Sequence, residues 1–68
     1  MAGWGDDPKL DELRNLIFED GWMAVEIKET READTVYLEK EGEERREVTS
    51  DHIAFHRFVE GLKEDLQL

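Results

Sequence analysis

The middle of the chain, residues 22–48, reads WMAVEIKETREADTVYLEKEGEERREV, and its apolar residues fall mainly at every second position. A period of two is the pattern that a β-strand imposes on its two faces. Polar stretches at 30–34 and 41–43 divide the segment into three runs, residues 22–29, 35–40 and 44–48. Connections this short join antiparallel neighbours, because a parallel crossover needs about a dozen residues or more. The sequence therefore predicts a three-stranded antiparallel meander.

The alternation also predicts which side chains share a face of the sheet. The aliphatic face collects Met23, Val25, Ile27, Val36, Leu38 and Val48. The opposite, open face collects Trp22, Ala24, Glu26, Lys28, Thr35, Tyr37, Glu39, Arg45 and Glu47. In the third run only Val48 is clearly apolar, so the sequence leaves open whether residues 44–48 form a true strand.

A helix is expected on the N-terminal side of the meander. Asp7 is a favoured N-cap residue, and Pro8 suits the first helical position. One face of this helix carries Leu10, Leu13 and Ile17. Gly21 then supplies the left-handed conformation that commonly ends a helix.

A second helix is expected after the meander, where the periodic signal is cleanest. Its apolar stripe, at spacings of three and four residues, consists of Phe55, Phe58, Val59, Leu62 and Leu66. Thr49, Ser50 and Asp51 are the N-cap candidates. The stripe is expected to cover the aliphatic face of the sheet rather than to dock on another chain.

These elements predict an α+β fold, a single small αβββα domain over residues 7–68 with both helices packed on one face of the meander. Residues 1–6 are expected to be a flexible N-terminal leader. The order and length resemble a double-stranded-RNA-binding domain. That family holds phosphates with lysines at the start of its second helix, whereas residues 49–54 here read TSDHIA. The resemblance therefore implies the topology and argues against the activity.

Composition limits the classes of function. The chain has 68 residues, 19 acidic against 9 basic, a formal net charge of −10 and no cysteine. The absence of cysteine excludes a disulfide scaffold, a thiolate zinc site and a cysteine nucleophile. No apolar run approaches the ~18 residues of a membrane span, and residues 1–6 do not resemble a signal peptide. A soluble, cytoplasmic protein is therefore expected.

The acidic surplus favours a protein partner over a nucleic acid. A net negative charge repels phosphate backbones, so no direct nucleic-acid binding and no membrane binding are expected. Carboxylates crowd the hairpin of residues 39–47, hereafter the acidic hairpin, although Arg45 and Arg46 interrupt the negative run. The acidic hairpin and the open sheet face are together predicted to bind the partner. The predicted partner-binding residues are Trp22, Glu26, Tyr37, Glu39, Glu41, Glu43, Glu44 and Glu47.

The sequence thus predicts a small acidic non-enzymatic interaction module that inhibits or regulates a protein with a basic, nucleic-acid-binding surface. One alternative is a structural or assembly protein, a homo-oligomer or virion connector that uses the open sheet face. Residues 36–66 loosely resemble small phage head–tail joining proteins, which would fit a virion connector. The predicted strand at 22–29 is not part of the helix–hairpin–helix arrangement of those proteins. The other alternative is a salt-adapted small domain of unknown role. The plainest interpretation of the acidity is a solvated surface that keeps a small protein soluble.

Catalytic and metal-binding signals are sparse. No nucleophile motif or phosphate-binding loop occurs, so neither catalytic residues nor a cofactor is expected. His52 and His56 are four residues apart, a spacing that places both on one side of a helix, and Glu60 follows one turn later. These three residues are a minor alternative metal site; the main expectation is that the chain holds no metal.

Overall fold

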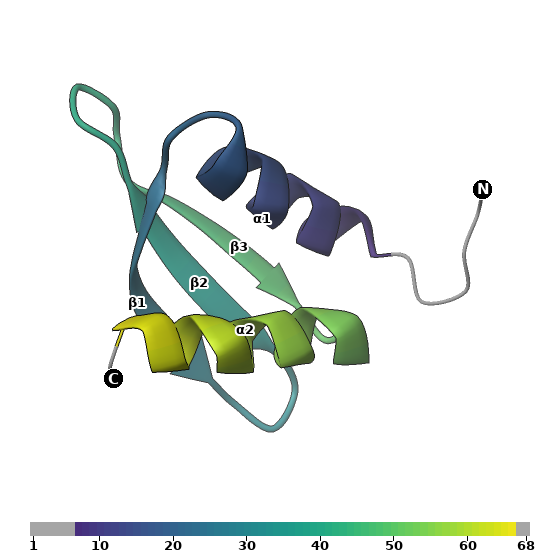
Figure 1. Ribbon diagram of the computed structural model, residues 1–68. Helices are drawn as coiled ribbons and strands as arrows, with labels where there is room; N and C mark the ends of the chain where they lie inside the picture. Colours follow the sequence, from purple (N-terminus) through teal and green to yellow (C-terminus); the bar gives the residue numbers. More distant parts are fainter. Residues whose placement is uncertain (1–6, 67–68) are drawn as a thin grey trace.

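Two helices and a three-stranded sheet follow one another in the order α-β-β-β-α (Figure 1). The computed structural model describes residues 7–66, so the expected leader at 1–6 lies outside the described residues. The elements are α1 (Pro8–Phe18), β1 (Met23–Glu29), β2 (Asp34–Glu39), β3 (Arg46–Ser50) and α2 (Ile53–Leu66). β2 lies between β1 and β3 and is antiparallel to both. The predicted α+β class and meander are confirmed.

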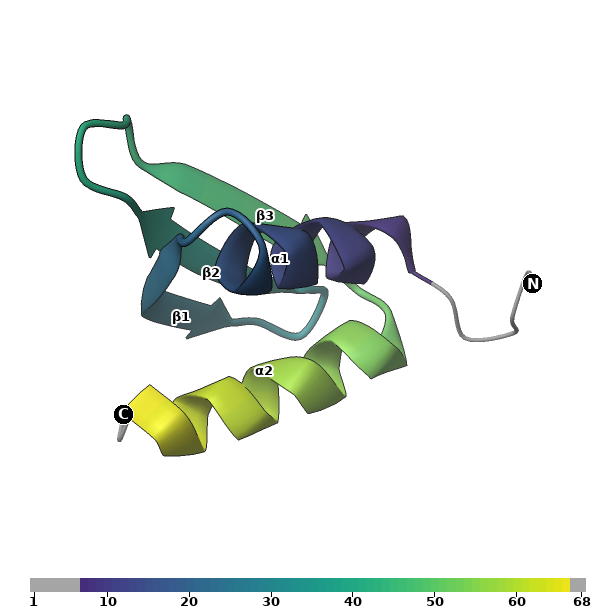
Figure 2. The same cartoon turned by 45° about the horizontal axis from the view of Figure 1, so that its top comes forward.

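Both helices lie on the same face of the sheet (Figures 1 and 2). The core between these layers consists of Leu13, Leu16, Trp22, Ala24, Val36, Leu38, Val48, Phe55 and Val59. Val36 and Val48 are directly opposite each other on neighbouring strands, and both are buried. Neither helix in residues 7–66 is long and apolar enough to cross a membrane. The other face of the sheet has no helix against it within the described residues.

A β-bulge in β1 reverses the predicted faces of its first half. Ala24 is opposite Leu38 and Glu26 is opposite Tyr37, so Val25 is the extra residue. An extra residue shifts the alternation by one, which exchanges the two faces. Trp22 and Ala24 are therefore buried, whereas Met23 is 67% exposed. The prediction that Met23 and Val25 face the core, with Trp22 and Ala24 on the open face, is wrong.

The start of α1 is tied to the end of β3 by one buried carboxylate. Asp7 Oδ1 accepts a hydrogen bond from the Lys9 amide at 3.1 Å, as an N-cap residue should. Asp7 Oδ2 accepts a second hydrogen bond, from the Ser50 hydroxyl at 2.6 Å. The predicted N-cap is confirmed, and it also fixes α1 against a strand 43 residues away in sequence.

The start of α2 and the third strand differ from their predicted positions. His52 caps α2, because its Nδ1 accepts the Ala54 amide hydrogen bond at 3.0 Å and its carbonyl accepts that of His56. Ser50 instead accepts a hydrogen bond from the His52 amide at 3.1 Å. The third strand is real but runs over residues 46–50 rather than 44–48, because the hairpin turn is longer than expected. Gly21 has the predicted positive φ, +82°, but α1 ends at Phe18 with its C-cap at Glu19, so the glycine lies two residues beyond the cap rather than directly after it.

Candidate functional site

The acidic hairpin projects beyond both helices at the upper left of Figure 1. Its turn closes with a hydrogen bond of 3.0 Å from the Glu43 amide to the Lys40 carbonyl. Gly42 adopts a φ of +82°, a conformation that glycine accommodates without steric cost. Residues 39–47 are all exposed. The turn therefore presents its carboxylates to solvent.

The carboxylates of this region divide into two groups. Glu26 accepts a hydrogen bond from Arg45 at 2.9 Å, and Glu39 lies 3.9 Å from the same guanidinium. The second group forms no ion pair within the described part of the chain, and it comprises Glu41, Glu43, Glu44 and Glu47. These four carboxylates are hereafter the hairpin carboxylates.

The three basic residues of the hairpin contact aromatic rings of the same domain. The Arg45 guanidinium lies 4.9 Å from the centroid of the Tyr37 ring. Arg46 and Lys40 lie 5.5 Å and 6.0 Å from the centroid of Trp22, distances at which a cation interacts with an aromatic ring. Arg46 also lies 3.6 Å from Glu12 of α1. The arginines that interrupt the acidic run in sequence are thus engaged within the domain.

An exposed apolar spot adjoins these charges. Met23 lies opposite Glu39 on the uncovered face of the sheet. It lines a shallow hollow with Val25, and the charged residues Glu39, Lys40, Glu41, Glu43 and Arg45 line the same hollow. Tyr37 is half-buried beneath Arg45. The surface therefore combines a small apolar contact area with a charged rim of three carboxylates and two cations.

The structure changes the composition of the predicted binding surface. It keeps Tyr37 and the carboxylates on the uncovered face or the hairpin, but it places Trp22 in the core, 7% exposed. Met23 takes its place as the exposed large side chain next to the hairpin. No local pattern signals this exchange, because it depends on the bulge at Val25 and hence on strand register.

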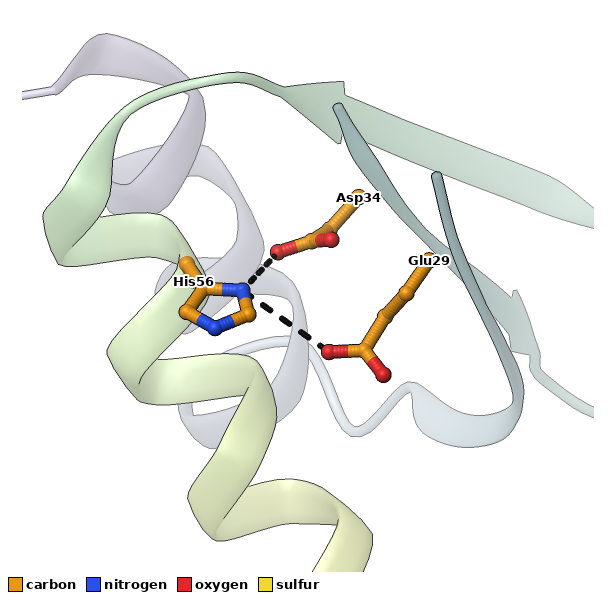
Figure 3. A group of neighbouring side chains, drawn as sticks. All are labelled: Glu29, Asp34 and His56. Carbon is orange, nitrogen blue, oxygen red and sulfur yellow. Dashed lines mark hydrogen bonds and ion pairs between the residues drawn. The ribbon is translucent and has the colours of Figure 1, made fainter. Parts of the chain in front are cut away.

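A second group of polar side chains lies at the opposite end of the β1–β2 pair. His56 Nδ1 is 2.7 Å from Asp34 Oδ2 and 3.7 Å from Glu29 Oε2 (Figure 3). The Asp34 side chain is 7% exposed, whereas that of His56 is 46% exposed. Glu29 and Asp34 are direct partners across β1 and β2. Three elements thus bring a histidine and two carboxylates together; these residues are hereafter the Glu29–Asp34–His56 cluster.

Neighbouring charges on α2 complete the electrostatics of this cluster. Lys63 Nζ lies 2.7 Å from Glu29 Oε1, and Glu60 Oε2 lies 3.8 Å from His56 Nε2. The hydrogen bond with Asp34 raises the pKa of His56 above its ordinary value. Hydrogen bonding with Glu60 and Lys63 lowers the pKa of Glu29, and the bond with Glu29 raises that of Lys63. The charged forms of His56 and Lys63 are thus stabilised by the carboxylates beside them.

The predicted metal-ligand set is not brought together as proposed. His52 uses Nδ1 to cap α2, so that nitrogen is occupied by the Ala54 amide. His56 instead contacts Asp34 and Glu29, two residues that the sequence analysis did not connect with it. Their proximity follows from the pairing of Glu29 with Asp34, which only the strand register reveals.

Comparison with known proteins gave no match: no family model, no curated protein and no solved structure matches this chain.

Proposed function

We propose that this protein is an interaction module that binds a basic protein surface through its acidic hairpin and the uncovered face of its sheet. The observation that carries the proposal is the arrangement of charge on the hairpin. Lys40, Arg45 and Arg46 turn to aromatic rings of their own domain, while the hairpin carboxylates stay exposed. The four hairpin carboxylates therefore form no ion pair with the cations of the same hairpin, although those cations keep their charge.

Two physical contributions support such binding. Four exposed carboxylates attract a cationic surface over roughly the Debye length, about 10 Å at 0.1 M salt, so they favour fast and salt-sensitive association. Met23 adds an apolar contact that salt does not screen, since it is 67% exposed beside the hairpin. A partner with lysine or arginine side chains around a small apolar residue fits both features.

The partner class that we favour is a nucleic-acid-binding protein. Such proteins display clusters of lysine and arginine, to which phosphates bind as anions. Carboxylates on a rigid hairpin satisfy the same cations. A domain that occupies this surface would compete with the nucleic acid, which makes inhibition or regulation the expected consequence.

Self-association is the second candidate, and the exposure of Met23 and Val25 favours it. Both residues lie on a strand at the edge of the sheet, where backbone groups are available for pairing with another chain. The high net charge opposes this mode, because two copies would bring like charges together. Self-association should therefore strengthen as salt rises, in contrast to binding of a basic partner.

The experiment compares two charge-matched variants in binding a lysine- and arginine-rich peptide. The hairpin variant carries Glu41→Gln, Glu43→Gln, Glu44→Gln and Glu47→Gln. The control variant carries Asp11→Asn, Glu19→Gln, Glu64→Gln and Asp65→Asn, all on exposed residues in or at the helices. Each variant loses four negative charges, so a difference between them reports the position of charge and not its total.

The proposal predicts that the hairpin variant binds about tenfold or more weakly at low salt, since exposed ion pairs contribute roughly 0.2–1 kcal/mol each. The control variant should bind within about twofold of the wild type. Equal loss in both variants would mean that the peptide responds only to net charge, and the proposed site would be wrong. Sedimentation at low and high salt tests self-association on the same samples.

A further inference from the structure

The Glu29–Asp34–His56 cluster lies far from the acidic hairpin along the β1–β2 pair, and the proposed function does not use it. Its arrangement follows from the sheet. Glu29 ends β1, Asp34 begins β2, and the two are paired directly across the strands. α2 packs on this sheet and brings His56 over the pair, as Figure 3 shows. Two strands and a helix fix the three side chains, rather than a single flexible loop.

We propose that Glu29, Asp34 and His56 form a binding site for a first-row divalent transition-metal ion, with Zn²⁺ as the representative ion. One donor atom from each residue lies within 4.8 Å of the other two. These donors are one imidazole nitrogen and two carboxylate oxygens. The site is distinct from the acidic hairpin, because a histidine and a buried carboxylate define it.

The chemistry of the donors selects the class of ion. Zn²⁺ binds imidazole nitrogen and carboxylate oxygen readily, and three protein ligands with one open position are a common arrangement. Ca²⁺ and Mg²⁺ prefer oxygen ligands throughout, so a site centred on His56 disfavours them. Glu60, on the side of the other ring nitrogen, is a further carboxylate available nearby.

Neighbouring contacts support the ligands without occupying their donor atoms. Lys63 contacts Oε1 of Glu29, whereas Oε2 of the same carboxylate faces His56 Nδ1. A ligating carboxylate in proteins is commonly held in this way by a second contact. Burial restricts Asp34, whose side chain is 7% exposed, so it needs little further ordering on binding.

Binding requires one local change. Ligands around Zn²⁺ at about 2.1 Å lie roughly 3.4 Å from one another in a tetrahedral arrangement. Glu29 Oε2 is already 3.7 Å from His56 Nδ1, but Asp34 Oδ2 is only 2.7 Å away and shares a hydrogen bond. The ion replaces the proton in that bond, and the two side chains separate by under about 1 Å. Binding therefore releases a proton and weakens as pH falls.

The test titrates the wild type and three variants with Zn²⁺ by calorimetry, and with Co²⁺ by its visible ligand-field absorption. His56→Gln and Asp34→Asn each remove a ligand. His52→Asn is the matched control, because it removes a histidine of the same helix while asparagine preserves the cap. The proposal predicts one ion per chain in the wild type and in His52→Asn, and affinity about tenfold or more weaker in the other two.

Two results would overturn the proposal: no binding by the wild type, or binding that His56→Gln leaves unchanged. Because Asp34 is buried and its variant could unfold, a second measurement uses the wild type alone. Paramagnetic Co²⁺ should broaden the NMR signals of residues 29, 34 and 56 first. Broadening centred on residues 41–47 would assign the ion to the acidic hairpin and contradict the proposed site.

Discussion

At the scale of single residues, two buried aspartates join distant parts of this fold. Asp7 caps α1 and binds Ser50, and Asp34 begins β2 and binds His56. Both aspartates are buried, with 7% and 5% exposure. A buried carboxylate is costly unless it is hydrogen-bonded, so each should matter more than the exposed carboxylates around it.

The Asp7→Ala variant should lose about 2 kcal/mol of unfolding free energy. It removes the cap of α1 and leaves the half-buried Ser50 hydroxyl without its acceptor, each worth about 1 kcal/mol. Urea unfolding followed by circular dichroism measures the change. Asp11→Ala, an exposed position of the same helix, is the control and should stay within about 0.5 kcal/mol. Equal losses in both variants would contradict the role given to Asp7.

His56 should make the stability of the protein depend on pH. Its pKa is raised in the folded state by the hydrogen bond with Asp34, and Glu60 and Glu29 are the other charged groups beside it; Lys63 pairs with Glu29. A raised folded-state pKa means that the contribution is fully present below the ordinary histidine value, about 6.5, and is lost as pH rises through the folded value.

Comparison of the wild type with His56→Gln isolates this contribution. The difference in unfolding free energy should be largest near about pH 6 and should shrink toward about pH 9. Unfolding by urea at a series of pH values gives the curve. A difference that is constant with pH, or that grows as pH rises, would show that the ion pair with Asp34 does not form in solution.

At the scale of elements, the bulge in β1 sets which surface the domain exposes. It buries Trp22 and Ala24 and turns Met23 outward. The bulge thereby adds a large aromatic side chain to the core, where loss of such a residue typically costs about 3–5 kcal/mol. It also supplies the apolar spot beside the acidic hairpin. One inserted residue thus affects both stability and the proposed binding surface.

Adjacent substitutions test the bulge. Met23→Gln should leave the unfolding free energy within about 0.5 kcal/mol, because the side chain is exposed. Ala24→Gln should lose about 2 kcal/mol or more, because it forces a larger, polar side chain into the core opposite Leu38. If the alternation ran without a bulge from Trp22 to Lys28, Met23 would be buried and Ala24 exposed. Met23→Gln would then be the more destabilising of the two substitutions. Thermal or urea unfolding of the two variants distinguishes these arrangements.

The elements show how far the sequence could predict this structure. Helix and strand types, their order, the cap at Asp7 and the positive φ of Gly21 follow from local patterns, and all were predictable. The faces of β1 were not, because a bulge depends on pairing with β2. The Glu29–Asp34–His56 cluster was missed for the same reason: its members lie 5 and 22 residues apart in sequence and meet only through strand register and helix packing.

At the scale of the whole molecule, the four hairpin carboxylates lie where they do little for stability. The hairpin carboxylates form no ion pair in residues 7–66, and the protein carries a net charge of −10. Mutual repulsion of like charges opposes the compact state. Their placement therefore favours a role in binding over a role in folding.

The hairpin variant should accordingly be at least as stable as the wild type. Removal of four neighbouring charges relieves repulsion and breaks no described ion pair, so we expect a gain of up to about 1 kcal/mol in unfolding free energy. The gain should diminish as salt rises, because salt screens exposed charges. A marked loss of stability would mean that these carboxylates serve the fold, and the case for a binding role would weaken.

The central claim is that the acidic hairpin and the uncovered sheet face form one binding surface. The most direct test is a titration of the ¹⁵N-labelled protein with a lysine- and arginine-rich peptide, followed by amide chemical shifts at low salt. We predict that the shifts change in residues 39–47 and around Met23 and Tyr37, and that the exposed side of α2 does not respond. Changes centred on α2 or on the Glu29–Asp34–His56 cluster, with the hairpin unaffected, would contradict the claim.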